Sequence, residues 1–264
     1  MTVCIGAICE NGACTVVAAD EMVTFGAPMN LQTEPPGLKK INTLTVESVL
    51  LYSGTVPDGE EMVRQTRRQI GGIIRPLVEQ VAEFAKNSYV MLKRRRIEET
   101  ILRPLIGADF PQYQNLIAQA ANSALLQNLL GMIAQHNLQT DLLIAGEDDI
   151  GHHIFIVTHP GICLPMDTLG FAAIGSGGLH ASISLSLGGQ AKTATLAQTL
   201  YNVFEAKKAS EVAPGVGKLT DIAILKNRTV IFVQDGAIDV LERVHRGRPT
   251  LSEQDQHAIS GALG

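Results

Sequence analysis

Thr2-Val-Cys-Ile-Gly-Ala-Ile-Cys-Glu-Asn-Gly-Ala-Cys-Thr-Val-Val-Ala-Ala-Asp20 is the stretch of sequence that decides the fold. Residues 2–9 alternate as the residues of a strand do, and residues 14–20 form a second run of strand-forming residues. Between them, Asn11-Gly12 is a residue pair favoured in tight hairpin turns. The sequence therefore predicts an opening β-hairpin that brings Thr2 and Asp20 to the same end.

The rest of the chain predicts blocks of strands and blocks of helices. Further strands are expected at 39–45, 47–53, 140–146, 152–158, 170–174, 220–225 and 229–233. Helices are expected from a cap at Asp58 to Ile74, through Val81–Leu92, and at 112–136, 179–188 and 192–209, with a loop at Pro104 and Pro111 and a short helix in the polar tail 249–264. Such blocks indicate an α+β fold. A four-layer αββα sandwich, with two stacked sheets and a helix layer outside each, satisfies this order.

Composition limits the classes of function. The chain has 264 residues, of which 45% are hydrophobic and 18% charged, as in globular proteins, and residues 1–264 are interpreted as a single domain. A net charge of −5 gives no reason to expect a nucleic acid or an anionic membrane as partner. No apolar run is long enough to span a membrane, and the start lacks the pattern of a signal peptide, so a cytoplasmic location is expected.

The cysteines and loops give no sign of a metal or cofactor. Cys4, Cys9, Cys14 and Cys163 form no C-x-x-C pair, and the pair His152-His153 has no carboxylate at metal-ligand spacing, which favours a surface position. The glycine-rich segment 175–178 lacks the lysine of a phosphate-binding loop. No metal and no cofactor are therefore expected.

Thr2 is a candidate nucleophile. Removal of Met1, which a small second residue permits, exposes an α-amine beside the Thr2 hydroxyl. The unperturbed pKa of an α-amine is about 7.7–8.0, so this amine can act as the base for its own hydroxyl. Asp20 ends the partner strand, and Lys40 starts the next one. A cation near the amine lowers its pKa, and an anion holds that cation in place.

Several segments together resemble proteasome β-type subunits and their bacterial relatives. They are Thr2–Gly6, Val17–Asp20, Thr24, Lys39-Lys40-Ile41, Ser53-Gly54, Ala173-Ile-Gly-Ser-Gly-Gly178 and Thr220-Asp-Ile-Ala-Ile224. The resemblance covers nearly the whole chain in the same order. It implies the N-terminal-nucleophile (Ntn) hydrolase fold and a threonine-type peptidase that cleaves peptides or unfolded proteins without a cofactor. It also implies a homo-oligomeric ring, and leaves open whether an ATPase partner is needed.

The resemblance also implies roles for individual residues. Thr2 attacks the scissile carbonyl and its amine takes the proton, directly or through a water. Lys40 tunes that amine, and Asp20 pairs with Lys40. The remaining roles are an oxyanion donor at the Gly54 N–H, a serine near the nucleophile at Ser176, a second acidic group at Glu211, a main-chain contact to substrate at Thr24, and an apolar specificity pocket lined by Val23, Tyr52 and Val56.

Departures from the family pattern leave alternatives open. Thr2 precedes Asp20 by 18 positions (20 − 2), two more than is usual in the family, whereas Cys4 has the usual separation. The first alternative is therefore an Ntn amidase that uses Cys4. The second is a catalytically inactive structural subunit, because the turn 214–217 after Glu211 lacks the family's Ser-Gly-Gly. The extended helical region at about 86–112 carries Lys93–Arg96, which is either a solvated helix face or a docking surface for a partner.

Overall fold

The computed structural model describes residues 2–24, 32–34, 39–120 and 124–247. These residues belong to two compact units, Met1–Phe232 and Val233–Gly264, and each unit is described by itself. The helix expected at 249–264 and most of the loop expected at 28–37 lie outside the described residues.

The predicted opening hairpin is present. β1 (Cys4–Cys9) pairs antiparallel with β2 (Cys14–Asp20), from Cys4 opposite Ala19 to Cys9 opposite Cys14. The turn Glu10–Gly12 uses left-handed backbone at all three residues, and Gly12 adopts this conformation without steric cost. The hairpin lies inside a five-stranded antiparallel sheet of order β10-β1-β2-β11-β12, completed by β10 (Phe171–Ile174), β11 (Thr220–Lys226) and β12 (Thr229–Phe232).

A second antiparallel sheet has the order β5-β6-β7-β8-β9. Its strands are β5 (Ile41–Thr45), β6 (Ser48–Ser53), β7 (Asp141–Glu147), β8 (His152–Thr158) and β9 (Ile162–Pro165). A separate pair joins β3 (Val23–Thr24) to β4 (Gln32–Thr33). The sequence did not predict β3, β4 or β9. β3 and β4 have only two residues each, too few to show a pattern of alternation.

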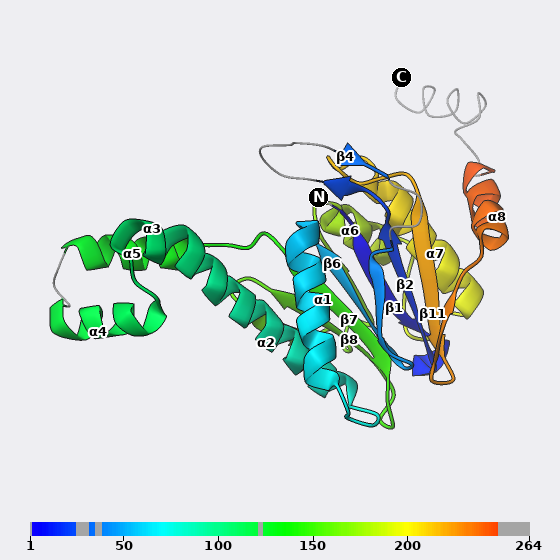
Figure 1. Ribbon diagram of the computed structural model, residues 1–264. Helices are drawn as coiled ribbons and strands as arrows, with labels where there is room; N and C mark the ends of the chain where they lie inside the picture. The colour runs from blue at the N-terminus through cyan, green and yellow to red at the C-terminus, as the bar shows by residue number, and fades with distance from the viewer. Residues whose placement is uncertain (1, 25–31, 35–38, 121–123, 248–264) are drawn as a thin grey trace, which may run out of the picture. The chain divides into compact units, whose positions relative to one another are not determined.

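The two sheets pack face to face, and helices cover their outer faces (Figure 1). The core between the sheets takes residues from both, among them Cys4, Val17, Val49, Leu51 and Leu143. α1 (Val56–Ile70) and α2 (Val78–Ile97) cover the second sheet, and α6 (Gly178–Leu187) and α7 (Leu196–Ser210) cover the first. The architecture is mixed α and β with two antiparallel sheets, which is compatible with the predicted α+β sandwich.

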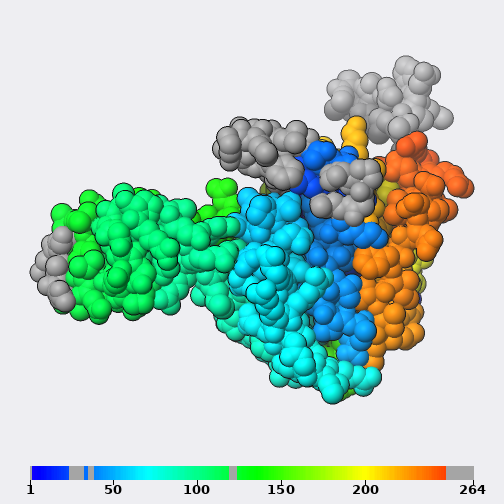
Figure 2. Space-filling view, viewed as in Figure 1, coloured from blue at the N-terminus to red at the C-terminus, as the bar shows by residue number. Residues whose placement is uncertain are grey.

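Beyond the sheet, α2 continues into a cluster of short helices (Figures 1 and 2). A π-helical stretch (Glu98–Leu102) leads to α3 (Arg103–Ile106), α4 (Phe110–Ala120) and α5 (Ala124–Gln135), which share an apolar core. The predicted loop at Pro104 and Pro111 is confined to residues 107–109, and both prolines themselves lie in helices. Pro111 is in the first turn of α4, where its missing N–H costs nothing. The expected single helix 112–136 is two helices.

The start of α1 and the basic run of α2 contact each other. α1 begins at Val56 with Thr55 as N-cap, so Asp58 lies in its first turn and is not the cap that the sequence suggested. Asp58 Oδ1 accepts from Arg96 Nη2 at 2.6 Å, and Glu61 Oε1 lies 3.4 Å from Arg95 Nη1. Part of the Lys93–Arg96 run is therefore engaged by carboxylates of α1.

The second unit contains α8 (Asp235–Arg246), in which Arg246 Nε donates to Glu242 Oε1 at 3.1 Å. None of the described helices, in either unit, combines the length and the apolar composition needed to cross a bilayer.

His152 joins the two sheets. Its side chain is buried at the start of β8, and its Nδ1 lies 2.9 Å from Thr15 Oγ1 on β2. The sequence suggested a surface position for this histidine, which is wrong because β8 turns His152 toward the first sheet. Burial lowers the pKa of His152, although Glu147 opposes that shift. The folded protein therefore holds this imidazole in its neutral form.

We expect His152 to make the protein less stable in mild acid. Below the unfolded-state pKa of about 6.5, the unfolded chain binds this proton more readily than the folded chain, so stability falls as the pH falls. Each unit of pKa depression is worth about 1.4 kcal/mol. His152→Asn should flatten the dependence of the unfolding free energy on pH between about 7.5 and 5, as measured by urea denaturation. The exposed His180 gives the control His180→Asn, and an unchanged slope in His152→Asn contradicts the assignment.

Candidate active site

Thr2, Asp20 and Lys40 meet at one end of the two stacked sheets. The register of the hairpin places Val3 beside Asp20, whose N–H donates to Val3 O at 3.2 Å. Thr2 lies one position further out, on the approach to β1. Lys40 comes from the other sheet, directly before β5. The three side chains therefore converge from both sheets. The predicted hairpin accounts for the meeting of Thr2 and Asp20, whereas the approach of Lys40 depends on the packing of the second sheet against the first.

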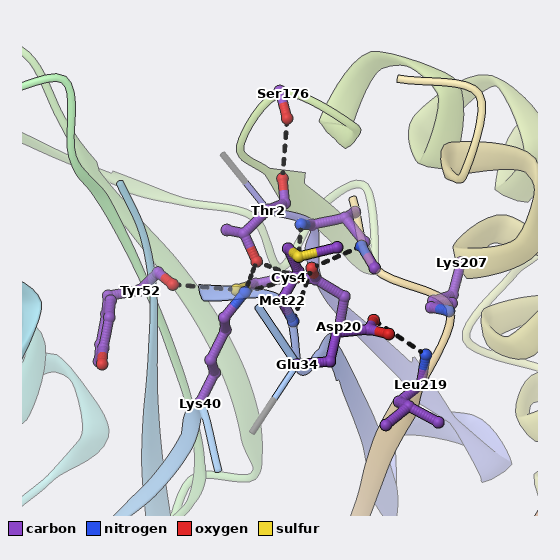
Figure 3. Close-up of polar contacts among 12 residues, drawn as sticks. Thr2, Cys4, Asp20, Met22, Glu34, Lys40, Tyr52, Ser176, Lys207 and Leu219 are labelled. Carbon is purple, nitrogen blue, oxygen red and sulfur yellow. Dashed lines mark hydrogen bonds and ion pairs between the residues drawn. The ribbon is translucent and has the colours of Figure 1, made fainter. Parts of the chain in front are cut away.

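The three polar groups contact one another directly (Figure 3). Lys40 Nζ lies 2.8 Å from Asp20 Oδ1 and also donates to Thr2 Oγ. Thr2 Oγ in turn donates to the same carboxylate oxygen. Relative exposures are 1% for Thr2, 0% for Asp20 and 3% for Lys40. Burial of an ion pair at this depth is favourable only when its remaining polar atoms are also hydrogen-bonded.

Backbone N–H groups provide those remaining hydrogen bonds to Asp20. Its Oδ1 accepts from Val3 N at 3.0 Å, and its Oδ2 accepts from Met22 N at 3.2 Å and Gly217 N at 2.9 Å. With the Lys40 ammonium and the Thr2 hydroxyl, five donors surround one carboxylate. Asp20 is thus a fixed negative charge that orients Lys40, and its lone pairs are already engaged.

The segment 175–177 holds the backbone of Thr2. Thr2 O accepts from Gly177 N at 3.3 Å and from Ser176 Oγ at 3.4 Å, and Ser176 Oγ also lies 3.2 Å from Pro214 O. Gly175 has a φ of +90°, and a Cβ on it would lie 2.2 Å from Thr2 O. Glycine at 175 is therefore needed both for its backbone conformation and for the close approach of Thr2.

A cavity of about 610 Å³ opens beside Thr2. It is lined by Thr2, Ser53, Gly54, Thr55, Asn137, Gln139, Asp141, Thr158, His159, Gly175 and Ser176. Three residues singled out from the sequence, Thr2, Gly54 and Ser176, thus share one cavity. Gly54 has a φ of +113°, and a Cβ there would lie 2.4 Å from Thr140 Oγ1, so only glycine fits between β6 and the chain before β7.

The residues expected to form the specificity pocket do not line this cavity. Tyr52 is buried in the core between the second sheet and α1 and α2, where its hydroxyl donates to Glu60 Oε1 at 3.0 Å. Its ring points away from Thr2 (Figure 3). Neighbouring residues of a strand face opposite sides, and the next residue of β6, Ser53, faces the cavity. Val23 is buried in β3, and Val56 is half-buried at the start of α1. Thr24 pairs with Gln32 across β3 and β4.

Glu211 has other partners than the nucleophile. Its Oε1 lies 2.7 Å from Lys207 Nζ and 3.2 Å from Lys208 Nζ, at the end of α7. Lys207 is fully buried and also donates to Lys218 O at 2.6 Å. Burial lowers the pKa of Lys207, an effect that Glu211 opposes. In this structure Glu211 therefore stabilises a buried lysine of α7, and a contact to Thr2 is not found among the described residues.

Cys4 has an environment that suppresses its reactivity. Its side chain is fully buried in the core between the sheets, and its Sγ donates to Tyr52 O at 3.3 Å. Burial raises the pKa of the Cys4 thiol far above its ordinary value, although Lys40 opposes the shift. A thiol of this kind supplies very little thiolate, the nucleophilic form.

Several residues of the cavity were not predicted from the sequence, namely Asn137, Gln139, Asp141, Thr158 and His159. Asp141 and Thr158 lie at the ends of strands, where polar residues are common. Only the strand order shows that these two ends meet at the cavity.

Among the described residues, no three His, Cys, Asp or Glu side chains lie close enough together to hold a metal ion. No protein-family model and no curated protein matches the chain.

Gly175→Ala should displace Thr2. The matched control is Gly189→Ala, because Gly189 also has a positive φ (+66°) but its Cβ would meet no described atom within 4 Å. Left-handed backbone costs both variants about 1–2 kcal/mol, and only Gly175→Ala adds the clash with Thr2 O. We expect the melting temperature of Gly175→Ala to lie several degrees below that of Gly189→Ala, at about 2–4 °C per kcal/mol. Equal melting temperatures contradict a clamp on Thr2.

Proposed function

We propose that this chain is a threonine-type Ntn peptidase with the αββα fold of proteasome β-type subunits. One observation carries the proposal: Thr2 Oγ is held between Lys40 Nζ and Asp20 Oδ1, beside a cavity that Gly54 also lines. A hydroxyl that a cation and an anion contact, at the edge of a cavity with room for a scissile carbonyl, matches what nucleophilic acyl transfer needs. The proposal requires removal of Met1, so that the base is the Thr2 α-amine.

The chemistry then uses Thr2 for two steps. Its Oγ forms a bond to the scissile carbonyl carbon while the α-amine accepts the hydroxyl proton. The carbonyl electrons move onto oxygen, which the Gly54 N–H stabilises. The C–N bond breaks as the ammonium returns a proton to the leaving amine, and an ester to Thr2 remains. Water, deprotonated by the same amine, hydrolyses that ester.

Lys40 and Asp20 have distinct roles in this mechanism. The Lys40 ammonium donates to Thr2 Oγ, so it stabilises negative charge that develops on that oxygen. Its positive charge also disfavours protonation of the α-amine, which keeps that amine basic near neutral pH. Asp20 is saturated by donors and serves to hold Lys40, which leaves the α-amine as the available base.

Peptides or unfolded proteins are the proposed substrates, and a homo-oligomeric ring is the proposed assembly. An exposed apolar row on α6 supports association with further subunits. Leu179, Ile183 and Leu187 recur every four residues along one side of that helix, and all three are exposed. Contiguous exposed apolar residues commonly mark interfaces between proteins.

One observation favours a second candidate, a catalytically inactive structural subunit. The second acidic group that the resemblance implied is occupied elsewhere, since Glu211 pairs with Lys207 and Lys208. The third alternative, a Cys4 amidase, is disfavoured by the burial and the raised pKa of the Cys4 thiol.

The decisive experiment is covalent capture of the native protein by a peptide epoxyketone, which reacts with both the hydroxyl and the amine of an N-terminal threonine. We expect one adduct per chain on Thr2, located by peptide mass spectrometry, and hydrolysis of peptide substrates. Thr2→Ala should abolish both, a loss of at least about 10³-fold in kcat because the nucleophile itself is missing. Thr193→Ala, at an exposed threonine, should leave both unchanged.

The intact mass of the purified chain separates the alternatives. A start at Thr2 with epoxyketone capture supports the peptidase. Retention of Met1 without capture contradicts it and favours the inactive subunit. A start at Cys4, with activity that survives Thr2→Ala and is lost in Cys4→Ala, selects the amidase.

A further inference from the structure

Three polar side chains form a row across the end of the second sheet. The register pairs Ser53 of β6 with Asp141 of β7, and Leu142 with Val157, so that Thr158 of β8 lies next to Asp141. Thr158 Oγ1 donates to Asp141 Oδ1 at 2.6 Å. We refer to Ser53, Asp141 and Thr158 as the polar row.

The polar row faces the nucleophile side of the sheet. Two residues further along the same strands are Leu51, Leu143 and Ile156, which belong to or pack on the core between the two sheets. Side chains two positions apart on a strand share a face, so the polar row faces the same way, at the point where that core ends. All three of its members line the cavity beside Thr2. The core between the sheets therefore ends at the polar row, where the cavity begins.

Asp141 is the single Asp or Glu among the described residues that line this cavity, and none of those residues is a lysine or an arginine. Thr158 holds one of its carboxylate oxygens, and the described residues provide no recorded hydrogen bond or ion pair for the other. Partial burial of a carboxylate without a cationic partner costs free energy, and a bound cation at its second oxygen would remove that cost. The site therefore presents an unneutralised negative charge beside the nucleophile.

Asp141 also borders a second cavity. That second cavity, of about 340 Å³, shares Asp141, Thr158 and Gly175 with the first and adds the apolar side chains of Ile156 and Leu179. His159 Nδ1, at the wall of the first cavity, is buried and has no hydrogen-bond partner among the described residues. The charge at Asp141 thus has apolar surface on one side and polar groups on the other. Lysine and arginine, with an apolar stem and a charged head, match this combination.

We propose that Asp141 determines the specificity of this site and selects peptides with a lysine or arginine side chain next to the scissile bond. The inference rests on the proposed function for the site, and it departs from the apolar pocket that the family resemblance implied. The ammonium or guanidinium pairs with the free oxygen of Asp141. Substrates with an acidic side chain at this position are rejected, because two carboxylates would face each other in a partly dehydrated cavity.

The test compares matched peptides with Lys, Arg, Gln, norleucine or Glu on either side of the scissile bond. We expect kcat/KM for the Lys and Arg peptides to exceed that for Gln and norleucine by about tenfold or more at one position. Asp141→Asn should reduce this ratio to within about twofold, and Asp141→Glu should retain part of it. Asp149→Asn, which neutralises an exposed carboxylate that pairs with Arg228, should leave the ratio intact.

A binding measurement keeps this inference separate from the peptidase proposal. Thr2→Ala lacks the nucleophile but keeps Asp141, so fluorescence anisotropy should show tighter binding of the Lys peptide than of the Gln peptide, with the difference reduced at high salt. Equal binding of the two peptides, or no binding, overturns the role of Asp141 even if the wild-type protein cleaves peptides. Selective binding without cleavage by the wild-type protein contradicts the peptidase and supports the role of Asp141.

Discussion

The buried ion pair between Asp20 and Lys40 is the interaction on which the rest of this site depends. Asp20 belongs to one sheet and Lys40 precedes the first strand of the other, so their contact at 2.8 Å fixes the two sheets to each other at the end where Thr2 lies. Three backbone N–H groups donate the remaining hydrogen bonds to the Asp20 carboxylate. Removing one partner from a pair of this kind typically costs about 3–5 kcal/mol, because the other charge stays buried. The same ion pair thus fixes the position of the Thr2 side chain and places the charges that surround it.

Close backbone approach is the second constraint. Gly175 and Gly54 both adopt positive φ, and neither tolerates a Cβ, because the carbonyl of Thr2 and the residues before β7 lie within 3 Å of where it would be. These two glycines come from different sheets and border the same cavity. Gly175 allows the chain after β10 to approach the backbone of Thr2, and Gly54 allows the chain after β6 to approach the residues directly before β7.

The period of two along a strand decides which residues of β6 serve the core and which serve the site. Tyr52 faces α1 and α2 and packs in their core, whereas its neighbour Ser53 faces the cavity. The resemblance placed Tyr52 in the specificity pocket, but the packing turns it away from the cavity. The same alternation on β7 and β8 brings Asp141 and Thr158 beside Ser53. The cavity therefore receives its charge from a strand far from Thr2 in the sequence.

The sequence by itself determined the hairpin, its turn and most strands, since these follow from local alternation and turn residues. It also nominated Thr2, Asp20 and Lys40 as candidates by their chemistry and position, and Gly54 and Ser176 by the family resemblance of their short motifs. It could not determine the partners of Glu211, the orientation of Tyr52, the helices that contain Pro104 and Pro111, or the place of Asp141. These depend on strand order and on packing between segments distant in the chain. A period of two says that neighbouring residues face opposite ways, but only the assembled sheets decide which face meets helices and which meets the nucleophile.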